Sequence, residues 1–298
     1  MELLQLYYFK ALAEREHLTQ TAQSLMIAAP TLSATISRLE KELGVKLFDR
    51  VGRNIQLNEN GRILLKYVNE MFNAMQNART ELRDLNDLSQ KRVTVATTAE
   101  SLWTKAIHVF LETHPDIHVV HDTLKLDDLN QDTVCGKYDF IITAQRDLID
   151  KDCWVYSVLY HDWPVLVFNE GHPFGGRESV DLIEAKYENF VALSKGYSSR
   201  RWFDETCAAA GFQPHIAVEC DYQLRTEMIR ANYGLGFSSI LGQKSNILNE
   251  FKYVRLSSPI ITRTQVIAWD KRRKLSGAAN IFRAFMVSYM KEFCQQNS

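Results

Sequence analysis

The hydrophobic positions between residues 18 and 44 recur at spacings of three and four, which is the period of a helix with one buried face. Thr19 can cap a short first helix, and Pro30 suits the first turn of a second. Gly44 then ends the second helix. Its apolar stripe comprises Leu32, Ile36, Leu39 and Leu43. A preceding helix is predicted by Leu3, Leu6, Phe9 and Ala13.

Residues 47–50 and 54–57 alternate between polar and apolar side chains, which is the two-residue period of a β-strand. The turn between them, at residues 51–53, makes the pair a hairpin with basic residues near its tip. A helix-turn-helix followed by a basic hairpin wing places one helix in the major groove of DNA and the wing on the flanking phosphates. The pattern therefore favours double-stranded DNA as a partner.

A longer helical pattern runs from residue 59 to about residue 88, and Asn58 can cap it. Its apolar residues alternate spacings of four and three, the heptad pattern of a coiled coil. At 1.5 Å per residue this helix is about 40 Å long, more than a small winged domain can cover. We expect it to dimerise, the alternative being that its stripe packs on the C-terminal domain of the same chain. The predicted dimerisation residues are Leu64, Val68, Met71, Met75 and Leu82.

Beyond a short polar hinge, strand and helix patterns alternate to the end of the chain, which implies a mostly parallel sheet with helices on its faces. The rhythm restarts near residue 164, so two lobes are expected. The predicted fold class is therefore α+β multidomain. Its parts are a winged helix-turn-helix at 1–58, a linker helix at 59–88 and a two-lobed α/β domain at 89–298, with lobe I at about 92–163 and 267–298 and lobe II at about 164–266.

Charge is distributed unevenly along the chain. The formal net charge of −1 over 298 residues argues against bulk electrostatic binding to nucleic acid. Residues 33–66 nevertheless carry a modest basic surplus, so phosphate attraction depends on where these charges lie. No apolar run approaches the roughly 18 residues that a membrane span needs. We expect a cytoplasmic protein with no membrane partner.

A set of residues at fixed spacing covers about the first sixty positions. It comprises Phe9, Leu18, Thr19, Ala22, Leu25, Pro30, Leu32, Ser33, Ile36, Leu39, Glu40, Leu43, Gly44, Leu47, Phe48, Arg50, Arg53, Leu57 and Gly61. This set resembles the N-terminal domain of LysR-type transcriptional regulators. The resemblance implies a homodimer or homotetramer and a C-terminal effector domain built like a periplasmic binding protein. His172-Pro173 and the glycines at 234 and 236 agree with the resemblance of the C-terminal region to such an effector domain.

The recognition helix departs from the family pattern, because Ala28-Ala29 stands where Ser-Gln is usual and Ala34-Thr35 where a long polar or basic pair is frequent. Alanine carries no hydrogen-bonding side chain, so Thr31, Thr35 and Arg38 are left to distinguish bases. The wing arginines then contact phosphates or a narrow minor groove. The residues predicted to contact DNA are Thr19, Thr31, Ser33, Ala34, Thr35, Arg38, Arg50 and Arg53.

Two loops of the C-terminal region, residues 97–101 and 194–200, follow a strand and open a helix. Small ligands bind at such strand ends in open α/β sheets, where helix N-termini present free N–H groups. These groups and Arg200 favour an anion, whereas Glu100 favours a ligand that also carries a donor. We expect a small-molecule effector between the lobes, and a carboxylate is one candidate. The alternative role for each Ser or Thr hydroxyl in these loops is to cap a helix. The predicted effector residues are Thr97, Thr98, Glu100, Ser101, Thr143, Ser198, Ser199 and Arg200.

The five cysteines are scattered and include no Cys-x-x-Cys pair, so we expect reduced thiols and no metal site. Cys207 is similar to the later cysteine of the peroxide sensors in the family that it resembles. Ser198 stands nine residues earlier and cannot form a sulfenic acid. We therefore do not expect a redox switch that pairs two cysteines at these positions. No catalytic motif such as Gly-x-Ser-x-Gly occurs, so we expect no enzyme activity and no cofactor. The rival interpretation is a two-lobed small-molecule-binding protein or enzyme with an incidental helical N-terminus.

Overall fold

The computed structural model describes residues 1–51, 54–85, 91–129, 134, 137–148, 153–245 and 251–297. The chain forms two compact units. Unit 1 is built around Met1–Asp87, and unit 2 around Leu88–Asn130, Lys137–Lys271 and Leu275–Ser298. Within the described residues, no helix is both long enough and apolar enough to cross a lipid bilayer.

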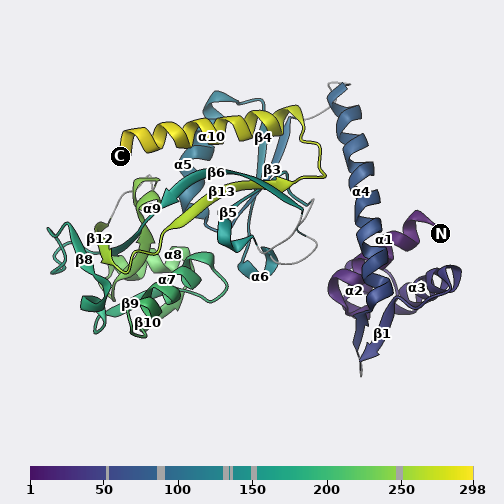
Figure 1. The fold of residues 1–298 in the computed structure, drawn as a ribbon, viewed down its shortest axis with the longest axis horizontal. Helices are drawn as coiled ribbons and strands as arrows, with labels where there is room; N and C mark the ends of the chain where they lie inside the picture. The colour runs from purple at the N-terminus through teal and green to yellow at the C-terminus, as the bar shows by residue number, and fades with distance from the viewer. Residues whose placement is uncertain are drawn as a thin grey trace. The chain divides into compact units, whose positions relative to one another are not determined.

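Unit 1 is a winged helix-turn-helix followed by a long helix (Figure 1). The side chains of Phe9, Leu32 and Leu39 are fully buried and hold the three N-terminal helices together. Two antiparallel strands form the wing, as the alternation predicts. The elements are α1 (Leu3–Arg15), α2 (Leu18–Ser24), α3 (Ala29–Leu43), β1 (Phe48–Val51), β2 (Asn54–Leu57) and α4 (Glu59–Leu85).

The helix ends of unit 1 correct one sequence prediction and agree with two. The cap of α2 is His17, whose Nδ1 accepts from the Gln20 backbone N–H at 3.3 Å, so the assignment of Thr19 as the cap is wrong. Gly44 ends α3 with a φ of +73°, a conformation that glycine adopts without a Cβ penalty. The Asn58 Oδ1 accepts from the Gly61 N–H at 3.0 Å and caps α4.

Two carboxylates anchor the strands of the wing. Glu40 on α3 is buried, and its Oε1 accepts from the Leu47 N–H at 2.9 Å while its Oε2 accepts from Lys46 at 2.6 Å. At the other strand, the Glu16 Oε1 accepts from the Leu57 N–H at 2.8 Å. The apolar stripe predicted for α3 is shorter than expected, because Leu43 is 37% exposed. The buried polar contact of Glu40 thus replaces the last apolar contact of the helix.

Helix α4 has one apolar face packed inside unit 1 and another that is exposed. Leu65 and Val68 belong to the core of the unit, with Val68 only 3% exposed. Val68 was predicted to be a dimerisation residue, and this is corrected, because its side chain is already covered within its own chain. Ile63 and Tyr67 are 54% and 59% exposed on the neighbouring face. The helix is therefore apolar over a wider arc than one heptad seam.

Lobe I of unit 2 contains a five-stranded sheet in the order β4-β3-β5-β13-β6. Strands β4, β3 and β5 are parallel, whereas β13 runs antiparallel to both β5 and β6, so the sheet is mixed and not mostly parallel. Trp103, Phe110, Phe140 and Phe282 fill the core beneath α5 and α10. The elements are β3 (Arg92–Thr97), α5 (Glu100–Thr113), β4 (His118–Thr123), α6 (Leu126–Leu129), β5 (Phe140–Ala144), the 3₁₀ turn η2 (Gln145–Asp147), β6 (Trp154–Asp162), β13 (Arg263–Asp270) and α10 (Gly277–Asn297).

Lobe II contains the four-stranded sheet β11-β7-β12-β8 and the parallel pair β10-β9. A bridge between Phe190 and Leu235 joins the pair to the larger sheet. Phe190 and Trp202 lie in its core. The elements are β7 (Pro164–Phe168), β8 (Ser179–Asp181), η3 (Leu182–Ala185), β9 (Asn189–Leu193), α7 (Ser198–Ala209), β10 (His215–Cys220), α8 (Tyr222–Arg230), β11 (Gly236–Ser239), α9 (Ile240–Ser245) and β12 (Lys252–Ser258).

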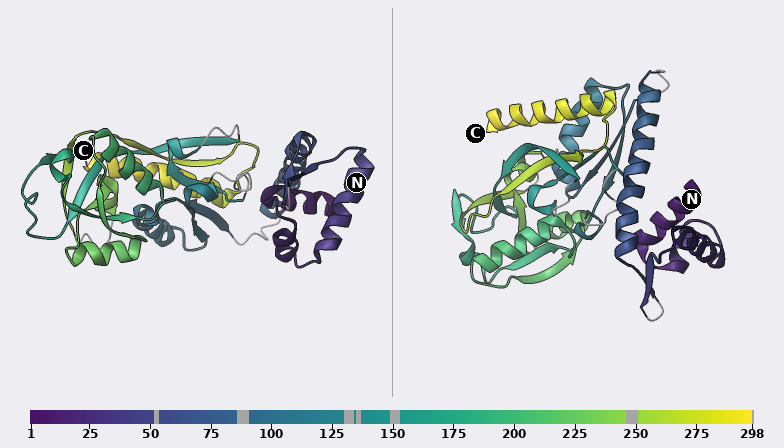
Figure 2. Two further views of the ribbon diagram at one scale, coloured as in Figure 1. Left: turned by 90° about the horizontal axis from the view of Figure 1, so that it is seen from below. Right: turned by 45° about the vertical axis from the view of Figure 1, so that its right-hand side comes forward.

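The antiparallel strands β6 and β13 run side by side where the chain passes between the lobes (Figures 1 and 2). Asp162 at the end of β6 is fully buried, and its Oδ1 accepts from the backbone N–H groups of Trp163 and Leu241, both at 3.0 Å. Burial raises the pKa of Asp162 to about 6, against the lowering effects of these hydrogen bonds, Ser239 and Arg263. The passage between the lobes therefore contains a carboxyl group that titrates near neutral pH.

We expect the Asp162→Asn variant to lose part of the pH dependence of stability. Between pH 3.8 and about 6 the folded chain binds more protons at Asp162 than the unfolded chain does, so the free energy of unfolding falls as pH rises through this window. Urea unfolding from pH 4.5 to 7 measures the slope of the free energy of unfolding against pH. This slope should be less negative in Asp162→Asn than in the wild type, but unchanged in the exposed control Glu178→Gln. Equal slopes in wild type and Asp162→Asn would contradict the raised pKa.

Candidate DNA-binding surface and effector site

The outer face of α3 presents small and polar side chains. Thr31, Ser33, Ala34 and Arg38 are exposed, as is Thr19 on α2. The hydroxyl of Thr35 donates to the backbone carbonyl of Thr31 at 2.8 Å, so its proton is committed inside the helix and the oxygen can only accept from a base. Donation to base edges by the predicted contacts of α3 is then left to Thr31, Ser33 and Arg38.

In the described part of the wing, Arg50 on β1 is an exposed cation. The predicted contact Arg53 lies outside the described residues. A residue that sequence reasoning missed is Met26, which is 94% exposed in the turn between α2 and α3 and has a φ of +55°. An apolar side chain so exposed beside a recognition helix can contact a thymine methyl group or a sugar.

A chain of hydrogen bonds links the two lobes of unit 2. In lobe I, the hydroxyls of Thr98 and Thr143 are 2.8 Å apart, and Thr143 donates to the Asp147 Oδ2 at 3.4 Å. From lobe II, Ser198 donates to the same carboxylate oxygen and Arg201 pairs with the other. Asp147 is only 1% exposed. Its carboxylate thus lies among the donors that we had expected to bind an anionic effector.

Three of the predicted effector residues, Thr98, Thr143 and Ser198, are therefore brought together by the fold. Asp147 and Arg201 were missed. Asp147 follows the carboxyl end of β5, three residues after Ala144, which is the same kind of position that singled out Thr143. Arg201 is the neighbour of Arg200, and the phase of α7 decides which of the two points toward lobe I.

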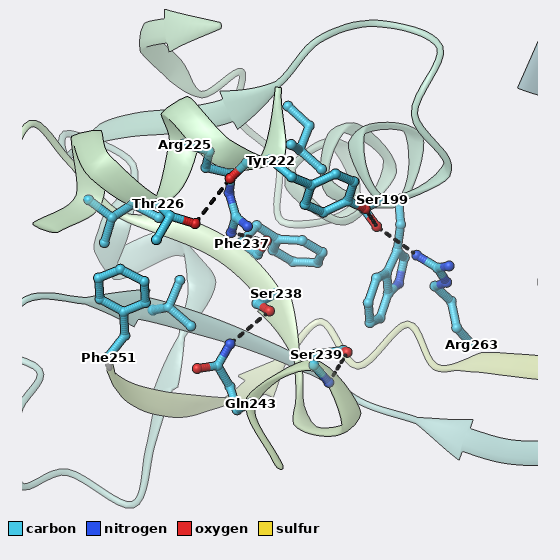
Figure 3. A pocket seen from close by; sticks show the side chains of 15 residues that line it. Ser199, Tyr222, Arg225, Thr226, Phe237, Ser238, Ser239, Gln243, Phe251 and Arg263 are labelled. Atoms are coloured by element: carbon cyan, nitrogen blue, oxygen red, sulfur yellow. Dashed lines mark hydrogen bonds between the residues drawn. The ribbon is translucent and has the colours of Figure 1, made fainter. Parts of the chain in front are cut away.

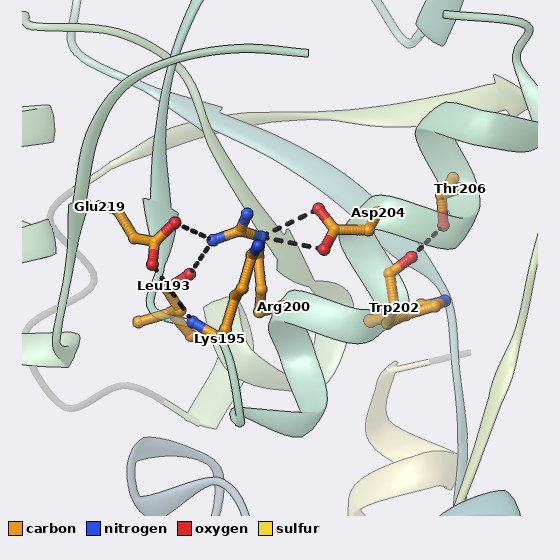
Figure 4. A network of polar contacts seen from close by, with 7 residues as sticks. All are labelled: Leu193, Lys195, Arg200, Trp202, Asp204, Thr206 and Glu219. Carbon is orange, nitrogen blue, oxygen red and sulfur yellow. Dashed lines mark hydrogen bonds and ion pairs between the residues drawn. The ribbon is translucent and has the colours of Figure 1, made fainter. Parts of the chain in front are cut away.

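Arg200 has a different role from the one predicted. Its Nε donates to the two carboxylate oxygens of Asp204 at 2.9 and 3.1 Å, and its Nη1 donates to Glu219 at 2.7 Å and to the Leu193 carbonyl at 2.8 Å (Figure 4). The side chain is buried against the ends of β9 and β10. Since its Nε and Nη1 donors are committed within lobe II, Arg200 is corrected from an effector contact to a structural ion pair.

The remaining predicted effector residues are dispersed. The Thr97 hydroxyl lies 2.9 Å from the His121 Nε2 in lobe I. The side chains of Glu100 and Ser101 lie outside the described part of the chain. Ser199 faces a pocket of lobe II, where its hydroxyl is 3.3 Å from the Tyr222 hydroxyl and accepts from the Arg263 Nη1 at 3.4 Å (Figure 3).

The cysteines are mostly as expected. Cys207, Cys220 and Cys294 carry reduced thiols, and burial raises the pKa of Cys207 to about 12, which leaves almost no thiolate at neutral pH. Cys153 is disulfide-bonded, so the expectation of reduced thiols is wrong there; spacing along the chain does not reveal which cysteines the fold brings together. Among the residues that the structure describes, no three His, Cys, Asp or Glu side chains are grouped to hold a metal ion.

Comparison with known proteins places both units in one family. The family model of the bacterial regulatory helix-turn-helix protein, lysR family, matches residues 3–62, and that of the LysR substrate binding domain matches residues 87–291. The transcriptional regulator YybE of Bacillus subtilis is 33% identical over 98% of this chain and all of that protein. The dual regulator GltC of the same organism is 28% identical over 99% of both chains.

Among solved structures, a full-length OxyR variant from Pseudomonas aeruginosa has the same fold, with a TM-score of 0.63 and 19% identity over 98% of this chain and 95% of that one. The winged helix-turn-helix, the mixed helix and sheet content and the effector-type domain agree with the resemblance in the sequence. This chain therefore belongs to the LysR family of transcriptional regulators, with an N-terminal DNA-binding domain and a C-terminal effector-binding domain.

Proposed function

We propose that this regulator binds a two-part operator as a cytoplasmic homodimer or homotetramer, and that a small effector entering between the lobes of unit 2 changes this binding. The observation that carries the proposal is the link through Asp147, because lobe I and lobe II meet on a single buried carboxylate. A ligand that competes for the donors of that carboxylate favours a different arrangement of the lobes. Only such a difference in affinity between two arrangements can shift their populations.

For DNA recognition, we propose that α3 reads bases and the wing contacts phosphates. Arg38 is exposed on α3, and an arginine can donate two hydrogen bonds to one guanine. Arg50 is exposed on the short wing, where its charge neutralises a phosphate whatever the neighbouring sequence. The other residues of the proposed contact surface are Thr19, Thr31, Ser33, Ala34, Thr35 and Arg53.

Selection of bound DNA from a randomised library tests this assignment. We expect Arg38→Ala to change which bases are selected, at a cost of about 1–3 kcal/mol per lost contact, and Arg50→Ala to weaken all sequences alike and reduce the salt dependence by about one unit. Arg230→Ala in unit 2 is the matched control and should bind as wild type does. Failure of the wild-type protein to enrich any sequence at low salt would refute the proposed DNA reading.

For assembly, we propose that the exposed apolar face of α4 pairs with the same face of a second chain. The supporting observation is the exposure of Ile63, Tyr67 and Leu82 along one helix. Met71 and Met75, predicted for the seam, are half-buried beside this face. Because a two-fold dimer places the same surface on both partners, one apolar helix face is sufficient to form it.

A further inference from the structure

A pocket of about 100 Å³ is lined by residues of β7, β11 and α8 in lobe II and by Arg263 of β13. Figure 3 shows its polar lining: Arg225 approaches from α8, Arg263 from the first position of β13, and hydroxyl groups from α7 and β11. The lining residues include these two arginines and no aspartate or glutamate. The pocket is therefore positively charged within its own walls.

Arg263 is buried without a counter-ion in the described part of the chain. It is 2% exposed, its guanidinium lies 4.8 Å from the centre of the Trp202 ring, and its Nε has no hydrogen-bond partner. Burial lowers the pKa of Arg263, while Asp147 and Asp162 oppose that shift from a distance. Both of these carboxylates accept from other donors, Asp147 from Ser198 and Asp162 from Leu241.

Arg225 adds a second guanidinium of the same kind. Its Nη2 donates to the backbone carbonyl of Phe237 at 2.7 Å, and it forms no ion pair among the described residues. Burial also lowers the pKa of Arg225. Ser238 accepts from the Gln243 side chain at 3.0 Å, which leaves the Ser238 O–H to donate elsewhere. Cations, a hydroxyl donor and enclosed space thus converge on one pocket.

A buried charge is costly unless an opposite charge and hydrogen bonds compensate it. We propose that this pocket binds a small oxyanion, either an inorganic one or the carboxylate of a small metabolite, between Arg225 and Arg263. A cavity of about 150 Å³ holds a benzene-sized ligand, so this smaller space suits a group of roughly five heavy atoms. None of the residues that line this pocket takes part in the link at Asp147.

Thermal unfolding of the full chain without DNA tests the proposal, with sodium phosphate, sulfate, acetate or succinate added against sodium chloride of equal ionic strength. We expect the Tm to rise with anion concentration by mass action and to saturate. Saturation by phosphate or sulfate assigns an inorganic oxyanion, and saturation by acetate or succinate assigns a carboxylate. No rise beyond that in sodium chloride with any of the four anions overturns the proposal.

Variants separate this site from general salt effects. We expect Arg225→Gln to raise the Tm of the anion-free protein, because an uncompensated buried charge is removed, and to abolish the response to anions. Ser238→Ala retains both charges and should weaken anion binding several-fold. This variant still tests the site if a variant that lacks Arg225 or Arg263 fails to fold. Arg230→Gln, on the same helix as Arg225, should respond as wild type does. An undiminished anion response in both Arg225→Gln and Ser238→Ala would refute the site.

Discussion

The Asp147→Ala variant is expected to lower the free energy of unfolding of unit 2 by about 2–4 kcal/mol. The substitution leaves the donors of Thr143, Ser198 and Arg201 without their shared acceptor, in a place that water hardly reaches. We place the value below that of a fully buried ion pair, because the Arg201 side chain is 35% exposed and its charge is partly solvated. Asp147→Asn retains an acceptor oxygen, so its free energy of unfolding should lie between those of the wild type and Asp147→Ala.

Urea unfolding followed by tryptophan fluorescence measures this loss in unit 2 alone, since every tryptophan of the chain lies there. The five are Trp103, Trp154, Trp163, Trp202 and Trp269. Glu227→Ala is the matched control, because Glu227 is an exposed carboxylate that pairs with Arg230, an exposed arginine of the same helix. Its loss should be clearly smaller than that of Asp147→Ala. Equal losses in the two variants would mean that Asp147 contributes no more than a surface ion pair.

The second large effect is expected from α4. We predict that Ile63→Lys combined with Tyr67→Lys converts the proposed dimer to a monomer and weakens binding to a paired operator by roughly 100-fold or more, because two linked half-sites gain about 10²–10⁴ in avidity. Burying each large apolar side chain contributes about 1.5–3 kcal/mol, and a two-fold interface counts each substitution twice. Charged side chains at both positions therefore oppose association strongly.

Sedimentation and mobility-shift measurements on the same preparations distinguish loss of assembly from loss of folding. Asn73→Lys, on another face of α4, should leave both the sedimentation coefficient and operator binding unchanged. Val68→Ala should instead destabilise unit 1, because Val68 packs in its core. A dimer that persists in the double lysine variant would show that another surface holds the two chains together.

Local periodicity predicted the elements of unit 1 well, because Leu32, Ile36 and Leu39 show the buried face of α3 within a few turns. It did not predict contacts between distant residues. Asp147 meets Ser198 and Arg201 across 51 and 54 positions, a separation at which spacing carries no information. In lobe I, the long strand β6 escaped notice because its buried positions do not alternate regularly along the sequence.

The rotational phase of a helix was the other property that the sequence did not predict. Arg200 and Arg201 are adjacent, and about 100° of rotation on α7 sends one to Glu219 in lobe II and the other to Asp147. On α4, the same uncertainty assigned Val68 to the outer seam and overlooked Tyr67. Which residue of such a neighbouring pair faces a site depends on where the helix is anchored by the rest of the fold.

The carboxylates of Glu40 and Glu16 hold the first and last residues of the wing hairpin to the helices of unit 1. We therefore expect the fold to fix the separation between the bases that α3 is proposed to read and the phosphates that β1 is proposed to contact. One base pair inserted inside a half-site displaces the outer contact by about 3.4 Å and roughly a tenth of a turn, which side-chain movement alone does not recover. We therefore expect operators of different length to differ in the DNA between their half-sites and not in the length of each half-site.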